Sequence, residues 1–274
     1  MGETLKRALF GSLFVAIVVA ACLYSYTSLF VLMALVSTIG LFEWLKIQQL
    51  DTPFNLIVTF MLNYMILGWG KPSLIIIGLG SSNVALGQMA LVVLALLIGV
   101  LIKYKVEAGA VVNKVLSGLI LISISSLLLL KLQAYEAADY SFVLPLTVFI
   151  LIWVSDTMAY VFGRMFGKHK LFEVLSPKKT IEGWVGGAAF TGLGGMLLYY
   201  IWGIGPLWQG LVLGILIAAF GVFGDLFISS IKRKLNLKDI GNIIPGHGGV
   251  LDRFDAFLFA VPVAFAWLAI TLVI

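Results

Sequence analysis

Three aspartates stand near the ends of two apolar segments in the C-terminal half of the chain. Asp225 is followed by Ser229 and Lys232 at offsets of four and seven residues, which places all three on one face of a helix. Asp252 and Asp255 are three residues apart at the start of the next apolar segment, so we expect them to share a helix face too. The two helix ends therefore predict a cluster of carboxylates at one depth.

These carboxylates are candidates for function because burying one inside an apolar span costs at least about 2.5 kcal/mol. Carboxylate oxygens beside cationic side chains suit Mg²⁺, which proteins bind through one or two carboxylates together with substrate phosphates. We predict Asp225, Asp252 and Asp255 as catalytic metal ligands, and the sequence leaves open a second cation. Alternatively, a neighbouring Lys or Arg neutralises each carboxylate. Acidic residues lie within or at the ends of predicted spans at Glu43, Asp156, Glu182, Asp225, Asp252 and Asp255.

Basic side chains surround the same helix ends. We predict that they bind substrate phosphates rather than only orient the chain, with the first two of the set also catalytic: Lys232, Arg233, Lys238 and Arg253. The alternative is attraction to anionic lipid headgroups, which contributes about 1 kcal/mol per basic residue. Basic density alone does not decide between the two.

A glycine-rich connection, residues 238–249, joins the two helix ends. Glycine lets backbone N–H groups approach an anion closely, and consecutive N–H groups form an anion-binding nest. Gly248 and Gly249 are therefore predicted, with Ser229, to bind substrate. His247 could bind phosphate, ligate a metal or only satisfy the loop, and these alternatives stay open. A zinc site is disfavoured because the chain has two histidines and one cysteine without metal-ligand spacing.

A second basic connection, residues 164–181, precedes another apolar segment. Thr180 is predicted to cap the helix that begins there, and a helix N-terminus attracts anions. We predict that 176–182 closes over the site, that Glu182 orients a lysine or a metal-bound water, and that four side chains contact phosphate: Ser176, Lys178, Lys179 and Thr180. The alternative is an ordinary basic start of a helix.

The composition indicates what must position these residues. Hydrophobic residues make up 61% of the 274 residues and charged residues 11%, whereas an average soluble domain has about 25% charged residues. A soluble globular protein is thereby nearly excluded, and long unbroken apolar runs favour transmembrane helices over a β-barrel. We predict an all-α, polytopic integral membrane protein with about nine transmembrane helices near 8–24, 27–46, 54–70, 83–102, 110–130, 141–163, 182–202, 207–231 and 254–274.

The chain is predicted to form a single membrane domain, 1–274, with N-terminal helices in 1–140 and the active site in 141–274. Nine spans would place sixteen of the eighteen Lys and Arg residues on one side of the membrane. Short cytoplasmic loops retain positive charge, so this side and the N-terminus are expected to be cytoplasmic. We expect the inner membrane of a bacterium, with the active site on its cytoplasmic side.

One long run of fixed polar positions resembles a known family. The run from Ser229 through Ile244-Pro245-x-His247-Gly248-Gly249 to Asp252-Arg253-Phe254-Asp255 is similar to the signature of CDP-diacylglycerol synthases, the phosphatidate cytidylyltransferases. Asp156-Thr157-x-Ala159-Tyr160-x2-Gly163 and Ser176-Pro177-Lys178-Lys179-Thr180-x-Glu182-Gly183 also resemble stretches of that family. The first 140 residues are similar only in being multi-span and apolar.

The resemblance implies that the phosphate of phosphatidic acid attacks the α-phosphorus of CTP, giving CDP-diacylglycerol and pyrophosphate with Mg²⁺ required. CTP, phosphatidic acid and membrane lipids would be the partners, with no nucleic acid, and a homodimer is left open. Two other functions stay open: a CTP-dependent lipid-alcohol kinase, which would transfer the γ-phosphoryl group, and a secondary transporter. The charges gather at one face rather than at the midplane, which disfavours transport.

Overall fold

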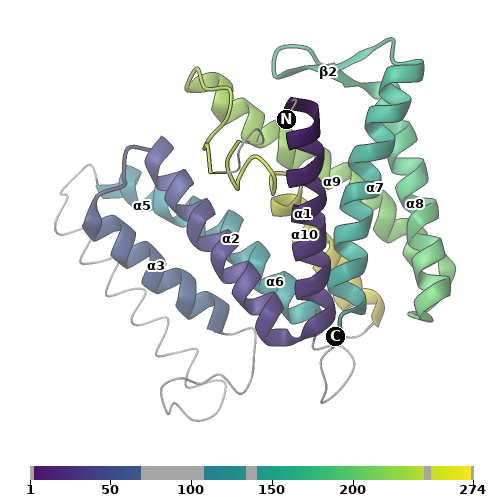
Figure 1. The fold of residues 1–274 in the computed structure, drawn as a ribbon, viewed down its shortest axis with the longest axis horizontal. Coiled ribbons are helices and arrows are strands. Elements are labelled where there is room, and N and C mark those ends of the chain that lie inside the picture. The colour runs from purple at the N-terminus through teal and green to yellow at the C-terminus, as the bar shows by residue number, and fades with distance from the viewer. Residues whose placement is uncertain (1–2, 69–107, 134–140, 244–247, 273–274) are drawn as a thin grey trace.

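The computed structural model describes residues 3–68, 108–133, 141–243 and 248–272, and it is mostly helical (Figure 1). The N-terminal part contains α1 (Glu3–Tyr24), α2 (Tyr26–Ile47), α3 (Pro53–Gly68), α5 (Ala108–Gly118), the π-helix η2 (Leu119–Ile124) and α6 (Ser125–Leu132). The C-terminal part contains α7 (Val143–Phe166), α8 (Ile181–Trp202), α9 (Leu207–Lys234) and α10 (Phe257–Leu272). Between α7 and α8 lies an antiparallel hairpin of β1 (Lys170–Phe172) and β2 (Ser176–Thr180).

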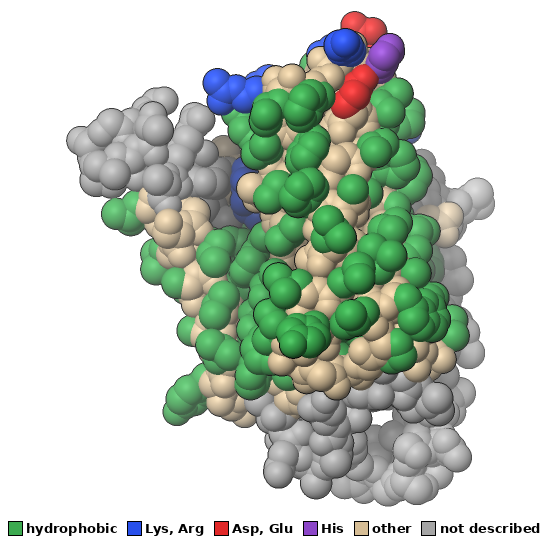
Figure 2. Space-filling view, turned by 90° about the vertical axis from the view of Figure 1, so that its right-hand side faces the viewer, with side chains coloured by type: hydrophobic (Ala, Val, Ile, Leu, Met, Phe, Trp, Pro, Cys, Tyr) green, Lys and Arg blue, Asp and Glu red, His purple; other side chains and the backbone are tan. Residues whose placement is uncertain are grey.

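The helices are those of an integral membrane protein. Within the described ranges, five helices are long and apolar enough to cross a membrane, and three shorter helices are also apolar. Apolar side chains cover the face of α7 and α8, and charged side chains gather at one end of it (Figure 2). The all-α prediction is confirmed apart from the short hairpin. The predicted span 83–102 lies outside the described residues, so the nine-span count stays a prediction.

Small residues bring α8 and α9 into backbone contact. A methyl group built on Gly195 of α8 would overlap the carbonyl of Gly210 on α9, and one built on Gly214 of α9 would overlap the carbonyl of Thr191. Close approach of this kind is typical of helix pairs in membranes, where apolar burial does not drive association. It fixes α9, which carries Asp225, against α8, which begins directly after the hairpin.

The elements that carry the predicted site lie together at one end of the bundle. The C-terminal ends of α2, α7 and α9, the hairpin, and the connection between α9 and α10 all lie at this end, whereas the α8–α9 connection lies at the opposite end (Figure 1). We call it the charged end, because α2, α7 and α9 each finish there in a turn with basic residues. The site is therefore built from segments far apart in the sequence.

Candidate active site

Helix α9 and the hairpin meet at Asp225. The Ser229 hydroxyl donates to Asp225 Oδ1 over 3.1 Å, which confirms the predicted shared face of these two residues. Lys179 Nζ of β2 forms an ion pair with Asp225 Oδ2. The hairpin thus reaches over α9, and the prediction that the second basic connection lies beside the aspartates is confirmed for Lys179.

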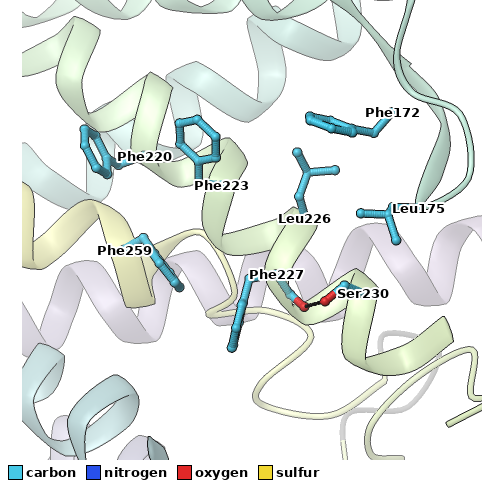
Figure 3. A pocket seen from close by; sticks show the side chains of 8 residues that line it. All are labelled: Phe172, Leu175, Phe220, Phe223, Leu226, Phe227, Ser230 and Phe259. Atoms are coloured by element: carbon cyan, nitrogen blue, oxygen red, sulfur yellow. Dashed lines mark hydrogen bonds between the residues drawn. The ribbon is translucent and has the colours of Figure 1, made fainter. Parts of the chain in front are cut away.

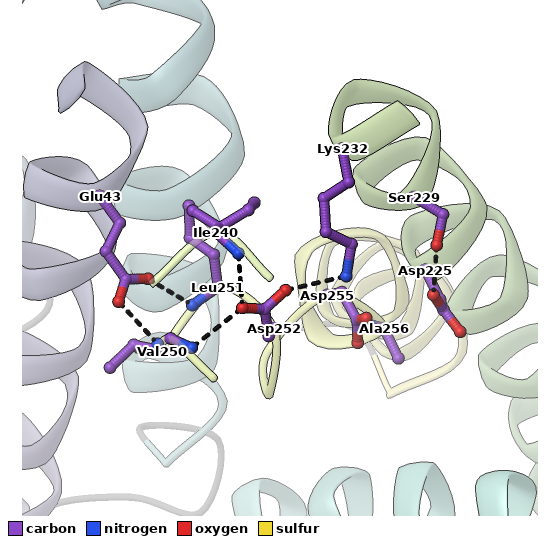
Figure 4. A network of polar contacts seen from close by, with 11 residues as sticks. Glu43, Asp225, Ser229, Lys232, Ile240, Val250, Leu251, Asp252, Asp255 and Ala256 are labelled. Carbon is purple, nitrogen blue, oxygen red and sulfur yellow. Dashed lines mark hydrogen bonds and ion pairs between the residues drawn. The ribbon is translucent and has the colours of Figure 1, made fainter. Parts of the chain in front are cut away.

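Asp252 is the most enclosed of the three aspartates (Figure 4). Its side chain is 2% exposed, and its Oδ1 lies 2.8 Å from Lys232 Nζ. Its Oδ2 accepts hydrogen bonds from the backbone N–H groups of Ile240, at 2.8 Å, and Gly249, at 2.9 Å. A carboxylate oxygen has two lone pairs, so Oδ2 is fully used. Any further ligand of Asp252 must therefore use Oδ1, which Lys232 already contacts.

Asp252 and Asp255 do not share a helix face, so that prediction is wrong. Helix α10 begins at Phe257, after both residues, rather than near 254. Asp252 accepts N–H groups of the preceding connection, and Asp255 Oδ1 accepts the N–H of Ala256 over 2.8 Å. Side chains that bond nearby backbone groups compete with helical hydrogen bonds. The two aspartate side chains therefore keep the segment before Phe257 in turns rather than in a helix.

Asp255 lies in this connection, outside both α9 and α10. Burial raises the pKa of the Asp255 carboxyl well above the usual range, and the charges of Asp225 and Asp156 raise it further. A divalent cation would relieve this repulsion, and carboxylate oxygens are the donors that Mg²⁺ prefers. Among the residues with a described placement, however, no group of three or more His, Cys, Asp or Glu is arranged to hold a metal. The donor set fits a cation held by one or two carboxylates plus substrate.

Glu43, near the C-terminal end of α2, also reaches this region. It is 3% exposed, and its Oε1 and Oε2 accept the backbone N–H groups of Val250, at 3.0 Å, and Leu251, at 2.9 Å (Figure 4). No predicted site residue lies in the N-terminal helices. A carboxylate in an otherwise apolar span was the available signal, but nothing in the sequence names a partner 207 residues away.

The glycines of the connection make room for the protein's own carboxylates. Gly248 has a φ of 85°, which favours glycine, and a methyl group there would lie 2.8 Å from Asp252 Oδ2. A methyl group on Gly249 would overlap the Glu43 carboxylate. The N–H groups of residues 249–251 donate to the carboxylates of Asp252 and Glu43. The roles of Gly248 and Gly249 toward substrate stay predictions.

The hairpin is held to the start of α8. Thr180 caps this helix as predicted, since its hydroxyl accepts the Gly183 N–H over 3.2 Å. Glu182 lies 2.6 Å from His169 Nδ1 and accepts the backbone N–H groups of Lys168 and His169, and no contact with a lysine side chain is seen among the described residues. Its other predicted role, orienting a metal-bound water, stays a prediction. Lys168 and His169 follow the end of α7, so Glu182 links the start of α8 to the end of α7.

The other predicted residues lie around this network. Four of them are exposed at the charged end: Lys178, Arg233, Lys238 and Arg253. Ser176 is half-buried in β2. His247 lies outside the described residues. Their phosphate-binding roles stay predictions.

An apolar groove of about 390 Å³ lies near the hairpin (Figure 3). Its lining is apolar except for one serine: Phe172, Leu175, Phe220, Phe223, Leu226, Phe227, Ser230 and Phe259. The helical period places Phe223 and Phe227 on the opposite side of α9 from Asp225 and Ser229. The groove is therefore separate from the carboxylate network.

Comparison with known proteins identifies the family of the chain. Residues 5–271 match the model of the cytidylyltransferase family. The chain is 45% identical over 130 residues to a phosphatidate cytidylyltransferase of Staphylococcus saprophyticus, covering 47% of this chain and 50% of that protein. It is 43% identical over 129 residues to the phosphatidate cytidylyltransferase of Staphylococcus aureus, with the same coverage. The chain thus spans about half the length of these curated relatives, and the match across nearly all its residues shows that it belongs to the cytidylyltransferase family.

Proposed function

We propose that this protein is a phosphatidate cytidylyltransferase, which converts CTP and phosphatidic acid to CDP-diacylglycerol and pyrophosphate in phospholipid biosynthesis. Family membership and the names of the relatives support the proposal. The observation that carries it is the pair of lysine–aspartate contacts, Lys179–Asp225 and Lys232–Asp252, at the charged end of an apolar bundle. This arrangement suits a reaction between two phosphate-bearing substrates, one of which stays in the lipid.

The reaction needs positioning more than activation of a nucleophile. A phosphate oxygen of phosphatidic acid attacks the α-phosphorus of CTP, the bond from that phosphorus to the α–β bridging oxygen breaks, and pyrophosphate leaves. A phosphate monoester has a second pKa near 6, so it is largely ionised at pH 7 and no general base is required. The site must hold two polyanions in line and reduce their repulsion.

The lysine–aspartate pairs provide charges for this task. One or two of the carboxylates of Asp225, Asp255 and Asp252, the last through its Oδ1, would hold Mg²⁺, which would supply positive charge against the triphosphate. Lys179 and Lys232, which contact Asp225 and Asp252 in the structure, would then be available to bind phosphate oxygens. The same lysines thus balance the aspartates without substrate and the phosphates with it.

The topology completes the proposal. We propose nine transmembrane helices, a cytoplasmic N-terminus and a site on the cytoplasmic side of a bacterial inner membrane. CTP would reach the charged end from the cytoplasm, while phosphatidic acid keeps its phosphate at the interface. The common placement of the basic ends of α2, α7 and α9 supports this orientation.

Product analysis tests the proposed function. Purified protein is incubated with CTP, phosphatidic acid and Mg²⁺, and the lipid and nucleotide products are identified by mass spectrometry. We expect a CDP-lipid and pyrophosphate in equal amounts, and neither product with EDTA. Release of CDP from CTP, with phosphorylation of an added lipid alcohol, would instead indicate a kinase.

A further inference from the structure

We propose that Glu43 is a positioning residue, which holds the 248–252 segment so that Asp252 and Lys232 face the reacting phosphates. The proposal rests on the proposed function for its catalytic consequence. It gives the N-terminal helices a part in a site otherwise built from the C-terminal half.

The contact between Glu43 and this segment is bidentate and buried. Each carboxylate oxygen accepts one of two consecutive N–H groups, from Val250 and Leu251, and Glu43 is 3% exposed. A buried carboxyl group that accepts two consecutive N–H groups is well placed to fix the backbone immediately before Asp252.

The surrounding packing is shaped around the Glu43 carboxylate. Methyl groups built on Gly241 or on Gly249 would both overlap it. Leu251, which is 1% exposed, packs against the same helix, since a methyl group on Gly40 would lie 3.2 Å from its Cδ2. Helix α2 thus contacts the 248–252 segment through both its backbone and the Leu251 side chain.

Asp252 depends on the same segment. Its Oδ2 accepts the Gly249 N–H, adjacent to the two N–H groups that Glu43 accepts. Loss of the Glu43 contact would free the N–H groups of two successive residues, Val250 and Leu251, and weaken the backbone support of the Lys232–Asp252 pair. Because displaced supporting groups typically cost 10–100-fold in activity, we expect Glu43→Ala to lower kcat by roughly that factor.

Trp44 provides the matched control. It is the next residue on α2, it is 3% exposed, and its Nε1–H donates over 2.8 Å to the carbonyl of Lys114, away from the 248–252 segment. Trp44→Phe removes a buried hydrogen bond from the same turn of the same helix. General loosening of α2 would therefore affect both variants, whereas loss of positioning would affect only Glu43→Ala.

Hydrogen exchange measures the positioning without relying on catalysis. We expect the peptide containing 249–252 to exchange faster in Glu43→Ala than in wild type or Trp44→Phe, and kcat to fall only in Glu43→Ala. Glu43→Gln keeps one acceptor oxygen, so its exchange rate and kcat should lie between those of wild type and Glu43→Ala. It replaces Glu43→Ala in the comparison if Glu43→Ala does not fold. Normal kcat, or unchanged exchange at 249–252, in the folded Glu43 variants would overturn the proposal.

A reciprocal variant tests the contact between Glu43 and Gly249 directly. Gly249→Ala should strongly reduce kcat because its methyl group overlaps Glu43. In the Glu43→Ala background this overlap is gone, so the double variant should be no less active than Glu43→Ala alone. Independent, additive losses would contradict the proposal. If wild type itself makes no CDP-lipid, the proposed function fails, while the exchange comparison still tests the contact.

Discussion

The two lysine–aspartate pairs differ in exposure, so we expect them to have different roles. In the outer pair, the side chains of Lys179 and Asp225 are 28% and 30% exposed. In the inner pair, those of Lys232 and Asp252 are 14% and 2% exposed. Water and ligands reach the outer pair more easily, so we expect it to exchange partners when substrate binds. The inner pair also joins the end of α9 to the connection that precedes α10.

Asp225→Asn tests the carboxylate of the outer pair. The amide keeps the shape but loses the charge that a cation requires, so we expect activity to fall by at least about 100-fold, as for other preorganised electrostatic groups. Turnover is measured at saturating CTP, lipid and Mg²⁺. Asp239→Asn, at an exposed position in the same region, is the matched control and should keep wild-type turnover. Near-normal activity of Asp225→Asn would exclude its role as a metal ligand.

Lys179→Gln tests the cation of the outer pair. Hydrogen bonds to charged groups contribute about 1.5–3 kcal/mol, so losing a phosphate contact should raise a KM by roughly tenfold or more. We expect this change for CTP or phosphatidic acid in steady-state kinetics. Lys170→Gln, on exposed β1, removes a charge from the same hairpin and should leave both KM values unchanged. Equal effects of the two variants would indicate general attraction to the membrane surface.

At this scale, local spacing predicted correctly for Asp225 and wrongly for Asp252 and Asp255, and it could not predict distant contacts. The offset of four residues correctly placed Ser229 beside Asp225. The glycines of the 238–249 connection suggested space for a ligand, but Glu43 and Asp252 occupy the N–H groups at 249–251. No periodicity relates Glu43 to a segment about 200 residues away.

At the scale of elements, apolar runs predicted the helices well because a membrane span must be continuous and apolar. The predicted 27–46 and 182–202 agree closely with α2 and α8. The hairpin was missed because its strands are short and its sequence, rich in lysine, lacks the alternation of a half-buried strand. The start of α10 was placed too early because side-chain contacts, which the apolar pattern does not show, hold the preceding turns.

The α8–α9 contact gives a prediction for a single methyl group. Gly195→Ala would overlap the carbonyl of Gly210, and overpacking of this kind typically costs about 1–3 kcal/mol. We expect a lower apparent Tm in detergent, together with lower activity because α9 carries Asp225. In Gly194→Ala, the nearest atom to the new methyl group is Leu151 Cδ2 at 3.5 Å, an ordinary contact. The neighbouring variant should therefore keep the wild-type Tm, and equal losses would refute this account of the packing.

At the scale of the whole molecule, the proposed orientation predicts which loops face the cytoplasm. In a Cys22→Ser background, single cysteines replace exposed Lys178 in the hairpin and exposed Gly205 in the α8–α9 connection, at opposite ends of the bundle (Figure 1). A membrane-impermeant maleimide added to intact cells should label Gly205→Cys and not Lys178→Cys. After permeabilisation, the maleimide should label Lys178→Cys as well. The reverse pattern would contradict a cytoplasmic site.

The fate of two phosphorus atoms tests the central claim most directly. Purified protein in lipid nanodiscs receives phosphatidic acid, Mg²⁺ and CTP labelled either at the α- or at the γ-phosphorus. We predict that the α-label enters the lipid fraction and the γ-label appears only in pyrophosphate, because the bond between the α-phosphorus and its bridging oxygen breaks. Transfer of the γ-label to lipid, with the α-label left in CDP, would contradict the account.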